Sequence, residues 1–166
     1  MQANRNRNNK KKIINDPIYG FISIPDEFIF DIIEHPYIQR LRRISQLGLS
    51  HLVYPGAVHT RFQHVIGAMH LMGQAISVLR KKGHTISDEE KRAVLLAILL
   101  HDIGHGPFSH ALEFDIVKSV THENISAYFI ERLEKYFGSD LRLALTIFED
   151  NYHKPFLHQL VSSQLD

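Results

Sequence analysis

The sequence predicts one mostly α-helical domain that begins with a short β-hairpin. Its 166 residues suit a single domain, and a hydrophobic content of 44% is enough to build a core. Apolar residues recur at helical spacing from Pro25 onward, and proline, glycine and capping residues divide them into segments. Only residues 12–24 contain short extended segments of the kind found in strands. We therefore expect the domain to span residues 12–166.

The N-terminal part is expected to contain a tail, the hairpin and two helices. The first twelve residues carry five basic side chains and no acidic one, which indicates a solvated, disordered tail over residues 1–11 or, alternatively, an anion contact. A proline and a glycine mark the turn between the two predicted strands. An apolar stripe predicts a helix over 26–34, and Pro36 separates it from a second helix that runs to about Leu47.

A helix that is apolar on every face is expected at the centre of the core. Ser87 and Glu90 form a capping box at its start. Residues 93–100 are all apolar, which is typical of a buried helix. We expect it to end at Ile103, with Gly104 in a left-handed cap. The other predicted segments are a loop over 48–60 and helices over 61–82, 121–137, 140–150 and 155–164.

The composition excludes several classes of protein. The chain has no cysteine, which excludes a disulfide scaffold, a cysteine-ligated zinc site and a thiol nucleophile, and which fits a reducing compartment. The longest wholly apolar run, from Ala93 to Leu100, is too short to cross a bilayer. No apolar signal segment follows Met1. We therefore expect a cytoplasmic protein without membrane contact.

Histidines are abundant and gather in the middle of the chain. Nine of the twelve fall between His51 and His122. His101 and Asp102 stand at the end of the helix predicted to be buried, where an unpaired carboxylate is costly. A bound cation removes that cost and suits the negative end of the helix dipole. A His–Asp hydrogen bond that only ends the helix is the alternative.

Neighbouring residues favour the metal site. His64 lies near the start of the preceding long helix, which must pack against the buried one. His105 and His110 occupy the following glycine-containing loop, and His122 begins the next helix. Ligands without sulfur suit iron, manganese, cobalt, nickel or zinc. Such an ion polarises a phosphoryl oxygen and activates water at neutral pH, while outer histidines move protons. Arg61, on the same helix face as His64, can pair with a phosphate.

The arrangement of these residues resembles a known family. His64 followed by His101-Asp102 is similar to the HD superfamily of metal-dependent phosphohydrolases. The blocks 54–64, 101–110 and 122–123 resemble the deoxynucleoside triphosphate triphosphohydrolases within it. The resemblance implies an HD-type helical bundle that cleaves between the 5′ oxygen and the α-phosphorus, giving a deoxynucleoside and tripolyphosphate.

The resemblance also implies roles for individual residues. His64, His101 and Asp102 correspond to metal ligands, and magnesium is a further candidate beside the substrate phosphates. The resemblance further implies a regulatory nucleotide site that promotes tetramer assembly. For Arg40 and Arg42, which would belong to this site, the alternative is that they lie on a solvated helix face. By correspondence, His105, His110 and His122 line the catalytic site, Gln46 and Arg61 contact substrate, and Lys12, Ile13, Asn15, Glu34, Arg40 and Arg42 form the regulatory site.

The chain departs from the family pattern at its C-terminal end. Related sequences continue past the segment 162–166 to a second aspartate, an arginine and a tyrosine-bearing helix. We expect that second aspartate to be the fourth metal ligand, with Asp166 as a substitute within the chain. The chain is therefore expected to be a fragment.

Expected partners are deoxynucleoside triphosphates as substrates, an activating nucleotide, and further copies of the chain in a dimer or tetramer. Nucleic acid bound by the basic tail is an additional candidate. Two other functions remain open. One is an HD hydrolase acting on nucleoside monophosphates, cyclic nucleotides or guanosine polyphosphates, against which the blocks 54–64 and 101–110 argue. The other is a non-catalytic module for nucleotide binding or oligomerisation.

Overall fold

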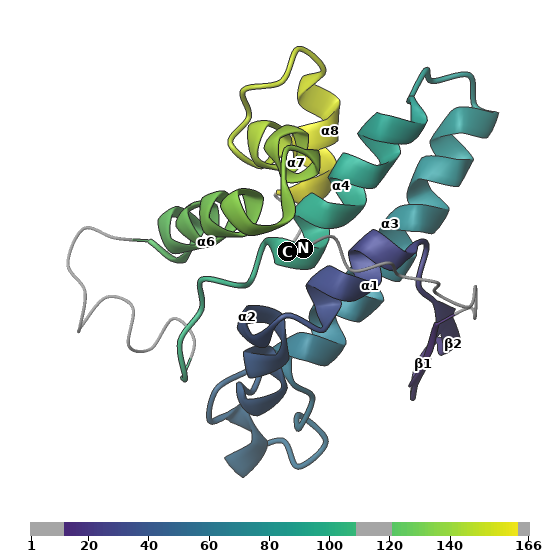
Figure 1. Ribbon diagram of the computed structural model, residues 1–166. Helices are drawn as coiled ribbons and strands as arrows, with labels where there is room; N and C mark the ends of the chain where they lie inside the picture. Colours follow the sequence, from purple (N-terminus) through teal and green to yellow (C-terminus); the bar gives the residue numbers. More distant parts are fainter. Residues whose placement is uncertain (1–11, 109–120, 163–166) are drawn as a thin grey trace.

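The computed structural model of the protein describes residues 12–108 and 121–162 (Figure 1). The predicted hairpin is confirmed: β1 (Ile13–Asp16) and β2 (Gly20–Ser23) pair antiparallel. The Asp16 carboxylate closes the turn by accepting hydrogen bonds from the next backbone N–H groups, at 2.8 and 3.0 Å. Gly20 has a φ of +71°, a conformation that glycine adopts without strain.

The second predicted helix is shorter than the sequence indicated. After α1 (Glu27–Ile33), α2 (Pro36–Gln39) continues as the 3-10 turn η1 (Arg40–Arg43) and stops there. The prediction of a helix to about Leu47 is wrong because the next backbone groups pair elsewhere. Ser45 forms an antiparallel bridge with Thr60, and the adjoining residues bond across the same pair of segments. Within the predicted loop lies one more short turn, η2 (Ser50–Leu52).

Two long antiparallel helices form the centre of the molecule. They are α3 (Arg61–Lys81) and α4 (Asp88–Leu100), which lie side by side in Figure 1. Capping boxes begin both: Thr60 with Gln63 for α3, and Ser87 with Glu90 for α4. Every residue from Ala93 to Leu100 is buried. The prediction of a central, buried helix is therefore confirmed for its apolar run.

Three further helices complete the bundle. They are α6 (His122–Phe137), α7 (Asp140–Phe148) and α8 (Pro155–Val161); α7 and α8 pack against α4, and α6 packs against α7. A partly buried polar cluster joins the segment before α8 to the start of α4. The Glu90 carboxylate pairs with Lys154 at 2.7 Å and accepts the Tyr152 hydroxyl at 2.8 Å. Burial raises the pKa of Glu90, but Lys154, the Ser87 N–H and Tyr152 outweigh it and leave the pKa below 4.5.

The turn after α4 is closed by tertiary contacts and not by a left-handed glycine. The prediction of a left-handed cap at Gly104 is wrong, since its φ is not positive. Gly104 instead lies against α6, where an added Cβ would stand 2.2 Å from the His122 carbonyl oxygen and 2.6 Å from the Ser126 nitrogen. The fully buried Ser126 hydroxyl accepts the Gly104 N–H at 2.9 Å and donates to the His101 carbonyl at 2.7 Å.

The architecture is thus mostly α-helical with an N-terminal hairpin, as the sequence predicted. Among the described helices, none combines the length and hydrophobicity that a bilayer crossing requires.

Candidate metal centre

The start of α3 and the end of α4 bring three potential metal ligands together. His64 lies in the first turn of α3, while His101 and Asp102 follow the last turn of α4. Because the two helices are antiparallel, these positions meet. The two histidine Nε2 atoms are 3.3 Å apart. The Asp102 carboxylate lies 3.4 Å from Nε2 of His101 and 3.8 Å from Nε2 of His64. The expected convergence of these three residues is confirmed.

The spacing and chemistry of these groups fit one divalent ion. Two atoms each about 2.1 Å from a common ion lie roughly 3.0–3.4 Å apart in tetrahedral or octahedral coordination. The observed separations are 3.3–3.8 Å. Nδ1 of His101 lies 2.7 Å from the Ile98 carbonyl, so its proton sits on Nδ1 and Nε2 offers a lone pair to the ion. The residues present could therefore hold a metal through two nitrogens and a carboxylate.

The Asp102 carboxylate is held in its ionised form although it is buried. Burial raises the pKa of Asp102, but His101, Arg61, His105 and His64 together act more strongly and hold the pKa below 3.8. Nη1 of Arg61 lies 2.5 Å from one carboxylate oxygen, and Nε2 of His105 lies 3.4 Å from the other. A negatively charged ligand is thus present at neutral pH without a metal having to deprotonate it.

Two predicted catalytic histidines stand beside this cluster. The rings of His105 and His122 stack with their centroids 4.0 Å apart and their planes 18° apart. His105 is buried, whereas the His122 side chain is 23% exposed and its Nε2 lies 3.8 Å from the Glu123 carboxylate. The third predicted catalytic histidine, His110, and the substitute ligand Asp166 lie outside the described residues.

The two predicted substrate-binding residues occupy different environments. Arg61 is 2% exposed and is engaged by Asp102, so it belongs structurally to the metal cluster. Gln46 is half-buried on the loop before α3, where its backbone N–H donates to the His59 carbonyl at 3.1 Å. Their contacts with a substrate remain predictions.

A pocket that the sequence did not indicate borders the metal cluster at His64. It has a volume of about 630 Å³ and is formed by the hairpin turn, the loop before α3 and one face of α3. Gly67 allows the hairpin to approach, because a Cβ there would stand 2.9 Å from the Tyr19 ring. The lining residues are Asp16, Pro17, Ile18, Tyr19, Gly56, Val58, His59, Gln63, His64, Gly67, Ala68 and Leu71.

The residues predicted to form a regulatory site are spread over the hairpin, α1 and η1. Lys12, Ile13 and Asn15 are exposed, and the Lys12 ammonium lies 4.7 Å from the centre of the Phe30 ring on α1. Glu34, which caps α1, is exposed as well.

The two arginines of that predicted site differ from each other. Arg42 is exposed, lying 3.6 Å over the Phe62 ring. Arg40 is half-buried and donates to the Ile103 carbonyl, so it braces the turn that carries Asp102, and burial lowers its pKa. Arg40 therefore does not lie on a solvated helix face. That it binds a nucleotide remains a prediction.

Ser126 is a structurally important residue that sequence reasoning missed. It joins the turn at His101–Gly104 to the helix that carries His122, through the two hydrogen bonds given above. A serine one turn into an ordinary helix gives no sequence signal of such a role, because the contact forms only in the tertiary structure.

Comparisons with known proteins agree with this geometry. A family model of the HD domain matches residues 61–156, more than half of the chain. The chain is 34% identical over 169 residues to a homologue of the deoxynucleoside triphosphate triphosphohydrolase from Dictyostelium discoideum. This alignment covers 92% of this chain and 32% of that protein. It is 40% identical over 130 residues to the Homo sapiens deoxynucleoside triphosphate triphosphohydrolase, covering 74% of this chain and 21% of that enzyme.

A solved structure is similar to this chain in both sequence and fold. A phosphohydrolase from Bacteroides thetaiotaomicron superposes with a TM-score of 0.89 at 59% sequence identity, covering 95% of this chain and 39% of that one. The chain spans a third or less of the length of the two curated relatives named above. Taken with the His64, His101 and Asp102 cluster, these matches show that the chain belongs to the HD-domain family of phosphohydrolases.

Proposed function

We propose that this chain carries the catalytic centre of a deoxynucleoside triphosphate triphosphohydrolase, which releases a deoxynucleoside and intact tripolyphosphate. The observation that carries the proposal is the convergence of His64, His101 and Asp102 with the stacked pair of His105 and His122 beside them. The substrate class is supported by relatives of 34–40% identity that carry this name. Since the chain spans only part of those relatives, the activity of the whole protein is part of the proposal.

His64, His101 and Asp102 would hold a divalent ion, drawn from iron, manganese, cobalt, nickel or zinc, with magnesium a further candidate beside the phosphates. When bound, such an ion supplies positive charge that polarises the α-phosphate and makes a water molecule more acidic. The Ile98 carbonyl orients the His101 ring for this purpose, and the neighbouring imidazoles and Arg61 keep Asp102 ionised.

The remaining residues bind phosphate and move protons. In the overall reaction water adds to the α-phosphorus, the bond to the 5′ oxygen breaks, and that oxygen takes a proton. His122 is better placed than His105 to supply this proton because its ring is more exposed. Arg61 has five N–H donors, so its contact with Asp102 is compatible with a second contact to phosphate. Gln46 and His110 complete the proposed substrate site.

Two further properties belong to the proposal. We expect assembly into a dimer or tetramer and control by a nucleotide bound at Lys12, Ile13, Asn15, Glu34, Arg40 and Arg42. The exposure of Lys12, Ile13, Asn15 and Glu34 is what supports a ligand contact there.

Product analysis tests the proposed reaction. Purified protein, loaded in turn with each candidate metal, is incubated with the four deoxynucleoside triphosphates, and phosphorus NMR identifies the products. Tripolyphosphate together with a deoxynucleoside supports the proposal. Pyrophosphate or orthophosphate as the first product would show that another phosphate bond is cleaved. Hydrolysis that persists at the wild-type rate in His101→Ala would refute the assignment of this site.

A further inference from the structure

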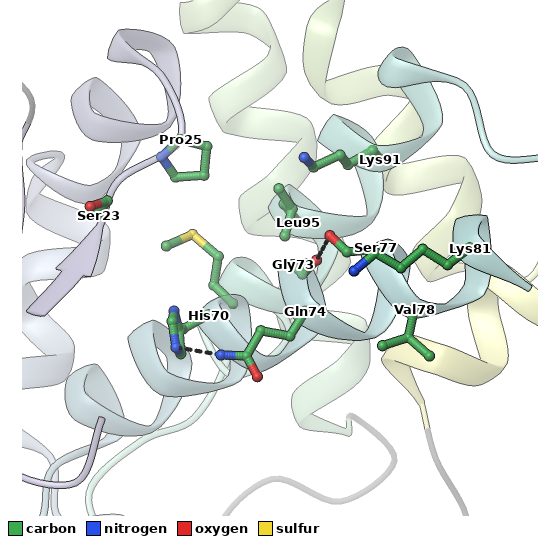
Figure 2. A pocket seen from close by; sticks show the side chains of 11 residues that line it. Ser23, Pro25, His70, Gly73, Gln74, Ser77, Val78, Lys81, Lys91 and Leu95 are labelled. Atoms are coloured by element: carbon green, nitrogen blue, oxygen red, sulfur yellow. Dashed lines mark hydrogen bonds between the residues drawn. The ribbon is translucent and has the colours of Figure 1, made fainter. Parts of the chain in front are cut away.

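A second pocket lies farther along α3, towards its C-terminal end, than the pocket that borders His64. Its volume is about 450 Å³, and α3, α4 and the end of the hairpin form its walls (Figure 2). The α3 residues that line it recur every three or four positions, from Met69 to Lys81, and therefore occupy one face of that helix. His64 is not among its lining residues. The pocket is thus separate from the metal cluster.

The pocket is positively charged and contains no carboxylate. Lys81 lies at the end of α3 and Lys91 near the start of α4, so the two lysines line the pocket from different helices. Figure 2 shows both side chains extending over the groove in the same direction, with Ser77 and Leu95 between them. Among the residues that the structure describes, neither ammonium group has an ion-pair or hydrogen-bond partner.

In the part of the chain that the structure describes, no nearby carboxylate forms an ion pair with Lys81 or Lys91. Lys91 also borders an adjoining groove that carries Asp26, Asp88 and Glu89. Two of these acids are engaged by arginines: Asp88 by Arg80 at 2.9 Å, and Asp26 by Arg92 at 3.3 Å. Two like charges that face one cavity repel each other, and a bound anion replaces this repulsion with attraction.

The rest of the lining is partly apolar and partly able to hydrogen-bond. Val78 and Pro25 provide an exposed apolar surface, and Gly73 and the edges of the buried Met69 and Leu95 lie beside it. Ser23, His70, Gln74 and Ser77 provide polar groups at its edge. Small-molecule sites typically combine an apolar wall with a few polar groups in a cavity of roughly 300–1,000 Å³. A free inorganic ion would leave most of this wall without contact.

We propose that this pocket binds a phosphorylated small molecule with an apolar or aromatic body, its phosphate between Lys81 and Lys91 and its body against Val78 and the edges of Met69 and Leu95. The site differs from the metal centre and from the predicted regulatory site in every residue. Ligand binding there holds the ends of α3 and α4 and the hairpin together, because all three contribute to the walls.

Lysine NMR with a non-hydrolysable probe tests the proposal. The protein is labelled by reductive ¹³C-methylation, which keeps the lysine charge, and is titrated with phenylphosphonate, inorganic phosphate and benzyl alcohol. The signals of Lys81 and Lys91 are assigned from those that K81M and K91M lose. Phenylphosphonate is expected to shift both signals saturably at lower concentration than inorganic phosphate, and benzyl alcohol is expected to leave them in place.

Matched variants make the result decisive. K81M and K91M are each expected to weaken phenylphosphonate binding by roughly tenfold or more, because each removes a charge-assisted hydrogen bond. K82M is the control, since Lys82 is the exposed neighbour that does not line the pocket, and it is expected to bind as the wild type does. Unmoved Lys81 and Lys91 signals, or shifts at Lys82 of the same size, would overturn the proposal.

Discussion

Replacing Ser126 with alanine removes two buried hydrogen bonds that tie the turn after α4 to α6. The hydroxyl accepts the Gly104 N–H at 2.9 Å and donates to the His101 carbonyl at 2.7 Å. Depriving a buried backbone group of its partner costs about 1–3 kcal/mol. For the two groups together we expect the free energy of unfolding to fall by about 2–4 kcal/mol. In a protein of this size that corresponds to a drop of roughly 5–15 °C in melting temperature.

Urea unfolding followed by circular dichroism measures this loss, and Ser77→Ala is the matched control. Ser77 is also a helical serine, but its hydroxyl bonds only to the Gly73 carbonyl of its own helix and is exposed. Its replacement is expected to change the free energy of unfolding by less than about 0.5 kcal/mol. Because the turn carries two proposed ligands, Ser126→Ala should also weaken metal binding by roughly tenfold or more. Equal stability of the two variants would refute the positioning role of Ser126.

Three other predictions follow from local geometry. Gly104→Ala should lower the free energy of unfolding by about 3 kcal/mol or more in thermal melts, because its Cβ meets the α6 backbone, whereas Gly106→Ala should be nearly neutral, having no atom within 4 Å. Glu90→Gln should lower the free energy of unfolding by about 2–4 kcal/mol at neutral pH, because it leaves Lys154 without its carboxylate partner. Burial raises the pKa of Glu90, but Lys154 and the other hydrogen-bond partners lower it more, so the folded pKa lies below 4.5. The ionised carboxylate therefore stabilises the fold above that pH. The gap between wild type and Glu90→Gln should therefore narrow as the pH falls through the folded pKa, and a gap that widens in acid would contradict this. Imidazole ¹⁵N NMR of metal-free protein should show the His101 proton on Nδ1; a proton on Nε2 would contradict the proposed ligand orientation.

Much of the fold and the meeting of the metal ligands could be predicted from the sequence because the signals are local. Capping residues define where α3 and α4 begin, and the unbroken apolar run identifies α4 as the core helix. Two adjacent helices joined by a short turn must pack antiparallel, so a histidine at the start of one meets a His-Asp pair at the end of the other. The ligand atoms lie within 4.8 Å of one another, as this reasoning requires.

Features that depend on contacts between distant segments could not be predicted. The helix expected to reach Leu47 ends at Arg43 because residues 44–46 pair with the segment before α3. Gly104 was expected to provide a left-handed cap, but it is required by the close approach of α6. Arg61 was expected to contact phosphate, and only the structure shows that Asp102 engages it. In each case the deciding partner lies far away in the sequence.

The central claim is that His64, His101 and Asp102 bind one divalent ion. The most direct test is metal stoichiometry, measured by inductively coupled plasma mass spectrometry after loading and gel filtration of the wild type, His101→Ala and His84→Ala. His84 is an exposed histidine just beyond the C-terminal end of α3, far along the helix from His64, and serves as the control. We predict about one ion per chain in the wild type and in His84→Ala, and loss of the ion in His101→Ala. Equal metal content in the two variants would contradict the claim.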